Sequence, residues 1–260
     1  MVTPRDTRVL ETGAEHLGIA LPTSALESFG RYQALLAEWN KRVNLTSVDD
    51  WDGVLRTHVL DSLTVAAALA PEILAAGRVV DVGSGAGFPG VPLKVVFPGL
   101  QLTLIEATGK KAVFLKHLVG ELALHDVDVL HGRAEDLAHE PGHREGYDLA
   151  LARALASMPA LVELTLPFLR AGGSLVAQKK GAFCEELASA RIAISEMGGR
   201  LERVDTIALP ELAEPRSLVV VRKRRPTPER FPRRAGMPAK RPILTGEVGR
   251  DLRHGQAGTP

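Results

Sequence analysis

The strongest constraint on the fold is a glycine-rich stretch, RVVDVGSGAGFPG, at residues 78–90. An apolar run leads past Asp81 into glycines at alternate positions, and apolar residues with helical spacing follow. This pattern predicts a buried parallel strand that turns tightly into a helix. Glycine tolerates positive φ and lets a ligand approach the backbone amides. Because open α/β sheets bind ligands at the carboxyl ends of their strands, we expect a ligand site here, with Asp81 in it.

The glycine spacing fits two classes of ligand. Read from Gly83, it is the Gly-x-Gly-x-Gly pattern of S-adenosylmethionine-dependent methyltransferases; read from Gly85, it is the Gly-x-Gly-x-x-Gly fingerprint of dinucleotide-binding proteins. Glu106, at the end of the next apolar run, is placed to bind a ribose diol in either case. Asp81 favours the first class, since its charge complements the cationic methionine end of S-adenosylmethionine. A turn whose glycines serve only packing is the weaker interpretation, because acids end both strands.

Apolar runs and helical segments alternate after this stretch, which predicts a parallel sheet covered on both faces. The expected strands are 78–82, 102–105, 127–130, 147–152 and 174–178, followed by an antiparallel hairpin of 201–209 and 217–221. Helices are expected over 158–169 and 183–197. The fold class is therefore α/β, with a Rossmann-like sheet. Helical spacing over residues 22–76, before the first strand, predicts an N-terminal helical cap. The expected domains are the cap at 1–76, the sheet domain at 77–223, and a basic, proline-rich, partly disordered tail at 224–260.

Polar residues interrupt the apolar pattern of the second helical segment in the cap. Arg56, His58 and Asp61 stand among Val54, Leu55, Val59, Leu60 and Leu63. One interpretation is that they face a cleft, and the other is that they form a solvated helix face with a local ion pair. The sequence leaves both open.

The tips of the later strands carry further candidates. Glu135 and Asp136 follow the third strand, where an acid can accept a hydrogen bond from adenine. Arg153 ends the fourth strand, which lacks both the Asn/Asp-Pro-Pro-aromatic motif of amine methylation and a cysteine nucleophile. A guanine N7 acceptor is compatible with these absences, because transfer to it needs positioning and desolvation more than a general base. Lys179 and Lys180 follow the fifth strand and are natural phosphate contacts.

Composition and charge narrow the class of protein. An apolar fraction of 45% and a charged fraction of 24% are ordinary for a globular protein. No apolar run is long enough to span a membrane and the start lacks a signal-peptide pattern, so we expect a cytoplasmic protein with no membrane partner. The lone Cys184 agrees with a reducing compartment and is expected in a helix core, and nothing implies a metal. From Arg222 onward, eleven Lys/Arg stand against three acids, which favours an RNA-binding arm over a solubilising tail.

Several of these stretches together resemble one family. They are Trp39-Asn40 with Asn44-Leu45-Thr46, Arg56-x-His58-x-x-Asp61-Ser62, the stretch 81–90, Arg153-Ala154, Lys180-Gly181 and the Arg-Pro-rich tail. In this order, from about residue 25 to 244, they resemble the GidB-type methyltransferases of the bacterial small-ribosomal-subunit RNA. The resemblance implies S-adenosylmethionine as cofactor on a Rossmann-like sheet. It also implies methylation of a guanine N7, giving 7-methylguanosine, in 16S ribosomal RNA near the decoding site.

The resemblance assigns roles to individual residues by motif. Gly83 and Phe88 are expected to line the methionine side of the cofactor, Glu106 its ribose, Ala134 and Glu135 its adenine side, and Arg153 to complete the pocket. The cofactor-binding set also includes Asp81, Gly85 and Gly87. The expected contacts to the RNA, or to the small ribosomal subunit particle, are Arg56, His58, Lys180, Arg216 and the tail. No residue is required as a base.

Three alternatives stay open at this point. A small-molecule methyltransferase predicts transfer to a metabolite and indifference to the tail. A non-catalytic ribosome-assembly factor predicts RNA binding without cofactor binding, and a nicotinamide dehydrogenase predicts stabilisation by the other cofactor. We expect a monomer.

Overall fold

The computed structural model describes residues 6–244. Seven strands in this part of the chain form one sheet in the order β3-β2-β1-β4-β5-β7-β6. They are β1 (Arg78–Val82), β2 (Gln101–Glu106), β3 (Val127–His131), β4 (Tyr147–Arg153), β5 (Leu169–Lys179), β6 (Gly199–Ile207) and β7 (Arg216–Lys223). The first five are parallel, whereas β7 runs antiparallel to β5 and to β6. This topology confirms the predicted Rossmann-like α/β sheet and its terminal hairpin.

The central strand β1 shows why the strands read as continuous apolar runs. Val79 belongs to the core on one face of the sheet, whereas Val80 and Val82 belong to the core on the other face. Successive side chains of a strand point to opposite faces, so a sheet covered on both sides buries them all. Strands are added in opposite directions on the two sides of β1, toward β2 and toward β4. The crevice at such a switch point is the usual place for a ligand.

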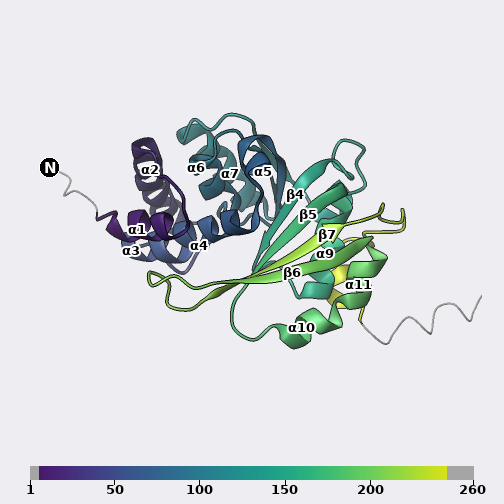
Figure 1. The fold of residues 1–260 in the computed structure, drawn as a ribbon. Coiled ribbons are helices and arrows are strands. Elements are labelled where there is room, and N and C mark those ends of the chain that lie inside the picture. Colours follow the sequence, from purple (N-terminus) through teal and green to yellow (C-terminus); the bar gives the residue numbers. More distant parts are fainter. Residues whose placement is uncertain (1–5, 245–260) are drawn as a thin grey trace, which may run out of the picture.

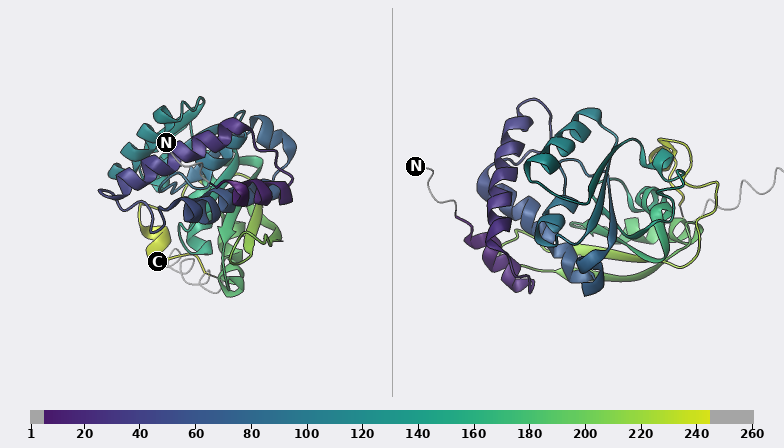
Figure 2. Two further views of the ribbon diagram at one scale, coloured as in Figure 1. Left: turned by 90° about the vertical axis from the view of Figure 1, so that its left-hand side faces the viewer. Right: turned by 90° about the horizontal axis from the view of Figure 1, so that it is seen from above.

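The N-terminal cap packs on the same face of the sheet as the helices that follow β1 and β2. Its elements are α1 (Arg8–His16), α2 (Thr23–Asn40), α3 (Trp51–Val54), a π-helical stretch η1 (Leu55–Leu60), α4 (Asp61–Leu63), a 3₁₀ turn η2 (Thr64–Ala68) and α5 (Pro71–Ala76). Figures 1 and 2 show α1 to α4 gathered at one end of the molecule beside α6 and α7. Phe29, Tyr32 and Leu36 of α2 join Phe88 and Phe114 in one core cluster. The cap therefore shares a core with the sheet, and the domain boundaries stay a prediction.

The remaining helices cover both faces of the sheet. They are α6 (Gly90–Val96), α7 (Gly109–Glu121), α8 (Ala134–Leu137), α9 (Met158–Thr165), η3 (Leu166–Phe168), α10 (Cys184–Ser189), α11 (Arg191–Glu196) and α12 (Met237–Lys240). α9 and α11 lie on the face opposite the cap (Figure 1). None of the helices between residues 6 and 244 has the length and apolarity that crossing a membrane requires.

Two helical predictions differ from the structure. The helix expected from 158 to 169 ends at Thr165, because Pro167 falls in the next turn, and Leu169 already starts β5. The helix expected over 183–197 is divided between α10 and α11. Cys184 is exposed, so its expected core position is wrong; its neighbour Phe183 is the buried side chain. The apolar pattern alone did not distinguish these adjacent positions.

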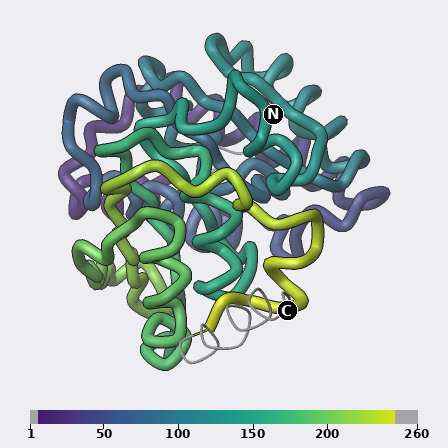
Figure 3. Tube along the Cα trace, turned by 90° about the vertical axis from the view of Figure 1, so that its right-hand side faces the viewer, coloured from purple at the N-terminus to yellow at the C-terminus, as the bar shows by residue number. Residues whose placement is uncertain are grey.

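The chain after β7 packs onto the body of the protein as far as residue 244. Figure 3 shows this segment in yellow, crossing one side of the molecule. The Arg144 guanidinium donates hydrogen bonds to the carbonyl oxygens of Thr227 (2.8 Å) and Phe231 (2.9 Å), and Phe231 is buried in the core. The sequence predicted an extended arm here, whereas residues 224–244 are docked. Residues 245–260 of the predicted tail lie outside the described part of the chain.

Two glycine substitutions test this docking. Gly198 has φ +79°, and a Cβ there would lie 2.2 Å from the Arg225 carbonyl oxygen. Gly198→Ala should therefore lower the free energy of unfolding by more than about 1 kcal/mol. Gly120 lies in α7 with open space around it, so Gly120→Ala should raise that free energy by about 0.5–1 kcal/mol. Urea denaturation measures both; a Gly198→Ala variant as stable as the wild type contradicts the docked geometry.

Candidate functional site

The glycine loop after β1 has the backbone that its sequence predicts. Gly83, Gly85 and Gly87 have φ values of +74°, +60° and +101°, a region that favours glycine. The amides of Gly83 and Ser84 both donate to the carbonyl oxygen of Ile105, at 2.9 and 3.0 Å, so the loop is tied to β2. A Cβ added at Gly85 would meet only one atom within 4 Å. The loop thus offers open space beside its backbone at the switch point.

Asp81 lies at the base of this loop and is completely buried. Its Oδ2 accepts a hydrogen bond of 2.9 Å from the Gly90 amide, whereas its Oδ1 has no partner in the described part of the chain. Burial raises the pKa of the carboxyl group to about 7, against the lowering effect of the Gly90 amide. A buried carboxylate oxygen without a partner is costly unless a ligand binds it. Asp81 is therefore suited to bind a cationic group of a ligand, such as the amino group of S-adenosylmethionine.

Glu106 at the tip of β2 holds the glycine loop in place. Its Oε2 accepts from the Gly85 amide at 2.9 Å, and its Oε1 accepts from the Thr108 amide at 2.7 Å. Each carboxylate oxygen can accept a further hydrogen bond, so a contact to a ribose diol stays compatible with this position. The sequence predicted the ribose contact but not the bond to the loop.

Phe88 is enclosed by three side chains from separate elements. Tyr32 of α2 stacks on it at 5.1 Å between ring centroids, and His58 of η1 stacks at 4.6 Å. The Arg153 guanidinium lies 5.1 Å from its ring centroid. The Tyr32 hydroxyl also donates to the carbonyl oxygen of Ala86 in the loop. The sequence indicated Tyr32 only as a core residue, and its helical spacing carried no signal of this contact.

His58 is held as a neutral ring. Its Nδ1 donates to the Thr57 carbonyl oxygen at 3.0 Å, so its Nε2 accepts from the Thr46 hydroxyl at 2.7 Å. Burial and the nearby Arg153 charge lower the pKa of His58 to about 4. The imidazole is therefore uncharged at pH 7 and stacks on the loop, a position that differs from the expected RNA contact.

Asp61 bridges two arginines, of which Arg216 is buried and Arg153 is mostly buried. Its Oδ2 lies 2.7 Å from Arg153 Nη1, and its Oδ1 accepts from Arg216 Nε. Gln178 at the tip of β5 donates to the Asp61 backbone carbonyl at 2.8 Å, while the buried Oε1 of Gln178 has no partner among residues 6–244. Asp61 and Arg216 are 1% and 3% exposed. Asp61 therefore does not lie on a solvated helix face, one of the two arrangements that the sequence left open, and Arg216 points inward rather than toward an RNA surface.

The other predicted RNA contacts stay at the surface. Arg56 is half-exposed, with its Nε 2.8 Å from Asp52 and its Nη1 3.0 Å from the carbonyl oxygen of Glu211. The exposed ammonium group of Lys180 lies 4.0 Å from Glu214. Both cations therefore lie beside the β6–β7 loop. The neighbouring Lys179 is mostly buried and pairs with Glu186, which leaves Lys180 as the available lysine of the two.

Ala134 and Glu135 begin α8, after the tip of β3. Both are buried, and Glu135 Oε1 accepts a hydrogen bond of 2.8 Å from the Gly236 amide. The sequence predicted both residues for the adenine side of a cofactor. It gave no indication that a segment about a hundred residues later would bind the same carboxylate.

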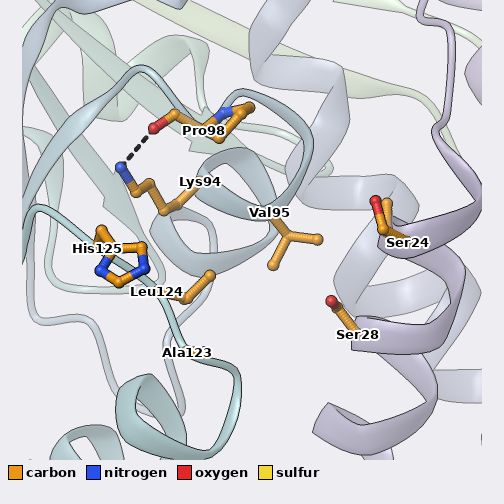
Figure 4. A pocket seen from close by; sticks show the side chains of 9 residues that line it. Ser24, Ser28, Lys94, Val95, Pro98, Ala123, Leu124 and His125 are labelled. Carbon is orange, nitrogen blue, oxygen red and sulfur yellow. Dashed lines mark hydrogen bonds between the residues drawn. The ribbon is translucent and has the colours of Figure 1, made fainter.

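A small hollow elsewhere in the fold is separate from this site. It has a volume of about 150 Å³ and lies near the far end of α6 from the glycine loop, against Ser24 and Ser28 of α2. Lys94 lines it and donates to the Pro98 carbonyl oxygen at 2.7 Å (Figure 4). Lys94 also donates to the Leu100 carbonyl. A buried cation on these carbonyls stabilises the end of α6, so we interpret the group as structural.

Comparisons with known proteins match most of this chain. The GidB family, described as rRNA small subunit methyltransferase G, matches residues 25–213. Ribosomal RNA small subunit methyltransferase G of Roseiflexus castenholzii is 47% identical over 87% of this chain and 95% of its own. The enzyme of the same name from Dehalococcoides mccartyi is 44% identical over 89% and 97%. A crystal structure of a mutant of MtNAS shares the fold alone, with 18% identity, a TM-score of 0.52, and coverage of 83% of this chain and 82% of that one.

The raised pKa of Asp81 predicts a specific dependence of stability on pH. A carboxyl group with a folded-state pKa near 7 and an ordinary value near 3.8 stabilises the ligand-free fold at low pH and loses that contribution as pH rises to 7. Asp81→Asn removes the titration. The Tm of this variant minus the Tm of the wild type should therefore rise by at least about 2 °C between pH 5 and pH 8.

Thermal unfolding of the ligand-free protein at the two pH values measures this difference. Asp128→Asn, a substitution on the exposed side of β3, controls for the change in net charge. A Tm difference for Asp81→Asn that stays constant with pH, as in the control, is the contradicting result.

Proposed function

Since this chain belongs to the GidB family of small-subunit ribosomal RNA methyltransferases, we propose that it transfers a methyl group from S-adenosylmethionine to a guanine N7 in 16S ribosomal RNA, near the decoding site. The observation that carries the proposal is the buried, unpartnered Oδ1 of Asp81 beside the glycine loop. In a family of methyltransferases, this oxygen is placed for the cationic end of the cofactor.

Different residues of the site contact different parts of the cofactor. Asp81 binds the amino group of the methionine part, and the glycine loop with Phe88 lines that part. Glu106 binds the ribose, and Ala134 with Glu135 lines the adenine side. When bound, the cofactor supplies an electrophilic methyl group. The protein's task is then to hold the acceptor nitrogen in line with that group and to exclude water.

The proposed acceptor atom makes a general base unnecessary. Guanine N7 carries a lone pair and no proton, so methylation does not require proton removal. His58 has both ring nitrogens in hydrogen bonds and a pKa of about 4, and Arg153 Nη1 lies 2.7 Å from Asp61 Oδ2. These side chains position the loop and the crevice, and the chemistry needs no further proton transfer.

The RNA contacts we propose on this side are Arg56 and Lys180, the cations exposed beside the β6–β7 loop. His58 and Arg216 act indirectly by positioning the loop and Arg153. The chain acts as a monomer in the cytoplasm, on RNA or on the small subunit particle. The large exposed apolar side chains between residues 6 and 244 are Val113, Leu201 and Val204. Three side chains on only two elements support a monomer better than an obligate dimer.

Tritium transfer from S-adenosylmethionine to small ribosomal subunits tests the proposal. The subunits are taken from cells lacking this gene, and the labelled nucleotide is mapped. We expect label at a guanine N7 near the decoding site, and transfer reduced at least about a hundredfold by Asp81→Ala, since a charged cofactor contact is lost. Asp128→Ala is the matched control and should transfer normally.

Each other outcome identifies a different function. Cofactor binding with no labelled RNA favours a small-molecule methyltransferase. RNA binding with no cofactor binding favours a non-catalytic assembly factor. Label at another atom keeps the methyltransferase and overturns the N7 assignment.

A further inference from the structure

The segment Arg233–Arg241 forms a closed loop on the body of the protein. Arg233 Nε and Nη2 bind the two carboxylate oxygens of Glu163 at 2.9 and 2.7 Å, and the Arg233 amide binds the same carboxylate at 2.8 Å. Arg233 Nη2 also donates to the Arg241 carbonyl oxygen at 2.7 Å. The side chain of Arg233 thus fixes both ends of a nine-residue loop.

The anchor of this loop is a completely buried carboxylate. Glu163 of α9 has no exposed surface, and taking a carboxylate out of water is expensive unless a bidentate partner replaces the water. A basic tail that served solubility alone needs no such anchor. The fixed geometry therefore indicates that the position of the loop matters.

The tip of the loop reaches the edge of the sheet where the cofactor site lies. The Gly236 amide binds Glu135 at the start of α8, and Gly236 has φ +81°, which allows the chain to turn there. His139 Nε2 binds the Pro232 carbonyl oxygen at 2.9 Å, on the same side of α8. α12, which completes the loop, contacts α9, the helix that follows the tip of β4. The loop therefore contacts both α8 and α9.

The outer side of the loop carries cations without acidic partners. Arg234, Lys240 and Arg241 are exposed, and within the described residues no carboxylate lies in ion-pair distance of them. Arg133, just before α8, is also exposed and unpaired. By contrast, Arg230 outside the loop pairs with Glu196 at 2.7 Å. Arg133 and the cations of the loop therefore lie beside the predicted adenine side of the crevice.

We infer that the loop 233–241 is a preformed contact for the phosphate backbone of the substrate RNA, made by Arg234, Lys240 and Arg241 on the adenine side of the crevice. This inference rests on the proposed function. It places a second RNA contact across the crevice from Arg56 and Lys180. The adjacent residues Arg233 and Arg234 then have opposite roles, one inside the fold and one toward RNA.

Salt-dependent binding tests the inference. The triple variant Arg234→Ala/Lys240→Ala/Arg241→Ala is compared with Lys116→Ala/Arg191→Ala/Arg200→Ala, which removes three exposed cations elsewhere. The probes are a 16S ribosomal RNA transcript and unmethylated small subunits. The loop variant should bind on the order of tenfold or more weakly at 100 mM salt, and the slope of log affinity against log salt should fall by about 2 to 3. The control should keep most of both values.

Two further measurements separate this inference from the proposed function. S-adenosylmethionine affinity and Tm should stay unchanged in the loop variant, whereas Arg233→Ala should lower both Tm and RNA affinity because it releases the anchor. If the wild type methylates small subunits but the loop variant binds RNA as the control variant does, the inference about the loop is wrong and the proposed function stands. A wild type that binds no ribosomal RNA overturns both.

Discussion

One carboxylate and two guanidinium groups, buried or mostly buried, hold the helical cap against the sheet. Asp61 comes from the cap, Arg153 ends β4, and Arg216 begins β7. Removing one partner of such a buried pair leaves an uncompensated charge, which lowers the free energy of unfolding by about 3–5 kcal/mol. Arg153 also lies over Phe88, so the same ion pair that joins cap and sheet supports the glycine loop. The predicted cofactor site and the cap are therefore held in place by the same interactions.

The same rigidity leaves one carboxylate oxygen of Asp81 without a partner among the described residues. The loop around it is held by Glu106, by Ile105 and by the Tyr32 hydroxyl, so the backbone cannot shift to satisfy the carboxylate. The ligand-free protein therefore carries a buried group that only a ligand can pair. Sites built in this way lower the stability of the empty protein in exchange for tighter binding of the correct ligand.

The local pattern of the sequence predicted the fold, and it also predicted the part of the site that the strand tips form. The glycine loop, Asp81 and Glu106 stand next to one another in the predicted strands, and strand tips of a parallel sheet meet at one edge. The partners of these residues come from far along the chain: Arg216 reaches Asp61 across 155 residues, and Gly236 reaches Glu135 across 101. Periodicity reports whether a residue is buried, but it does not report which charge it meets. For that reason the sequence predicted an RNA contact for Arg216 and not its pair with Asp61.

The docked C-terminal segment has a consequence for biosynthesis. Every predicted cofactor contact lies before residue 154, yet the loop that packs against Glu135 and Glu163 is made about seventy residues or more after these acids. During translation, Glu163 and Glu135 therefore lack these partners until the later segment has been made. The chain can complete this edge only when residues 233–241 have left the ribosome. An enzyme that modifies ribosomal RNA thus cannot reach its final form until long after its last predicted cofactor contact has been synthesised.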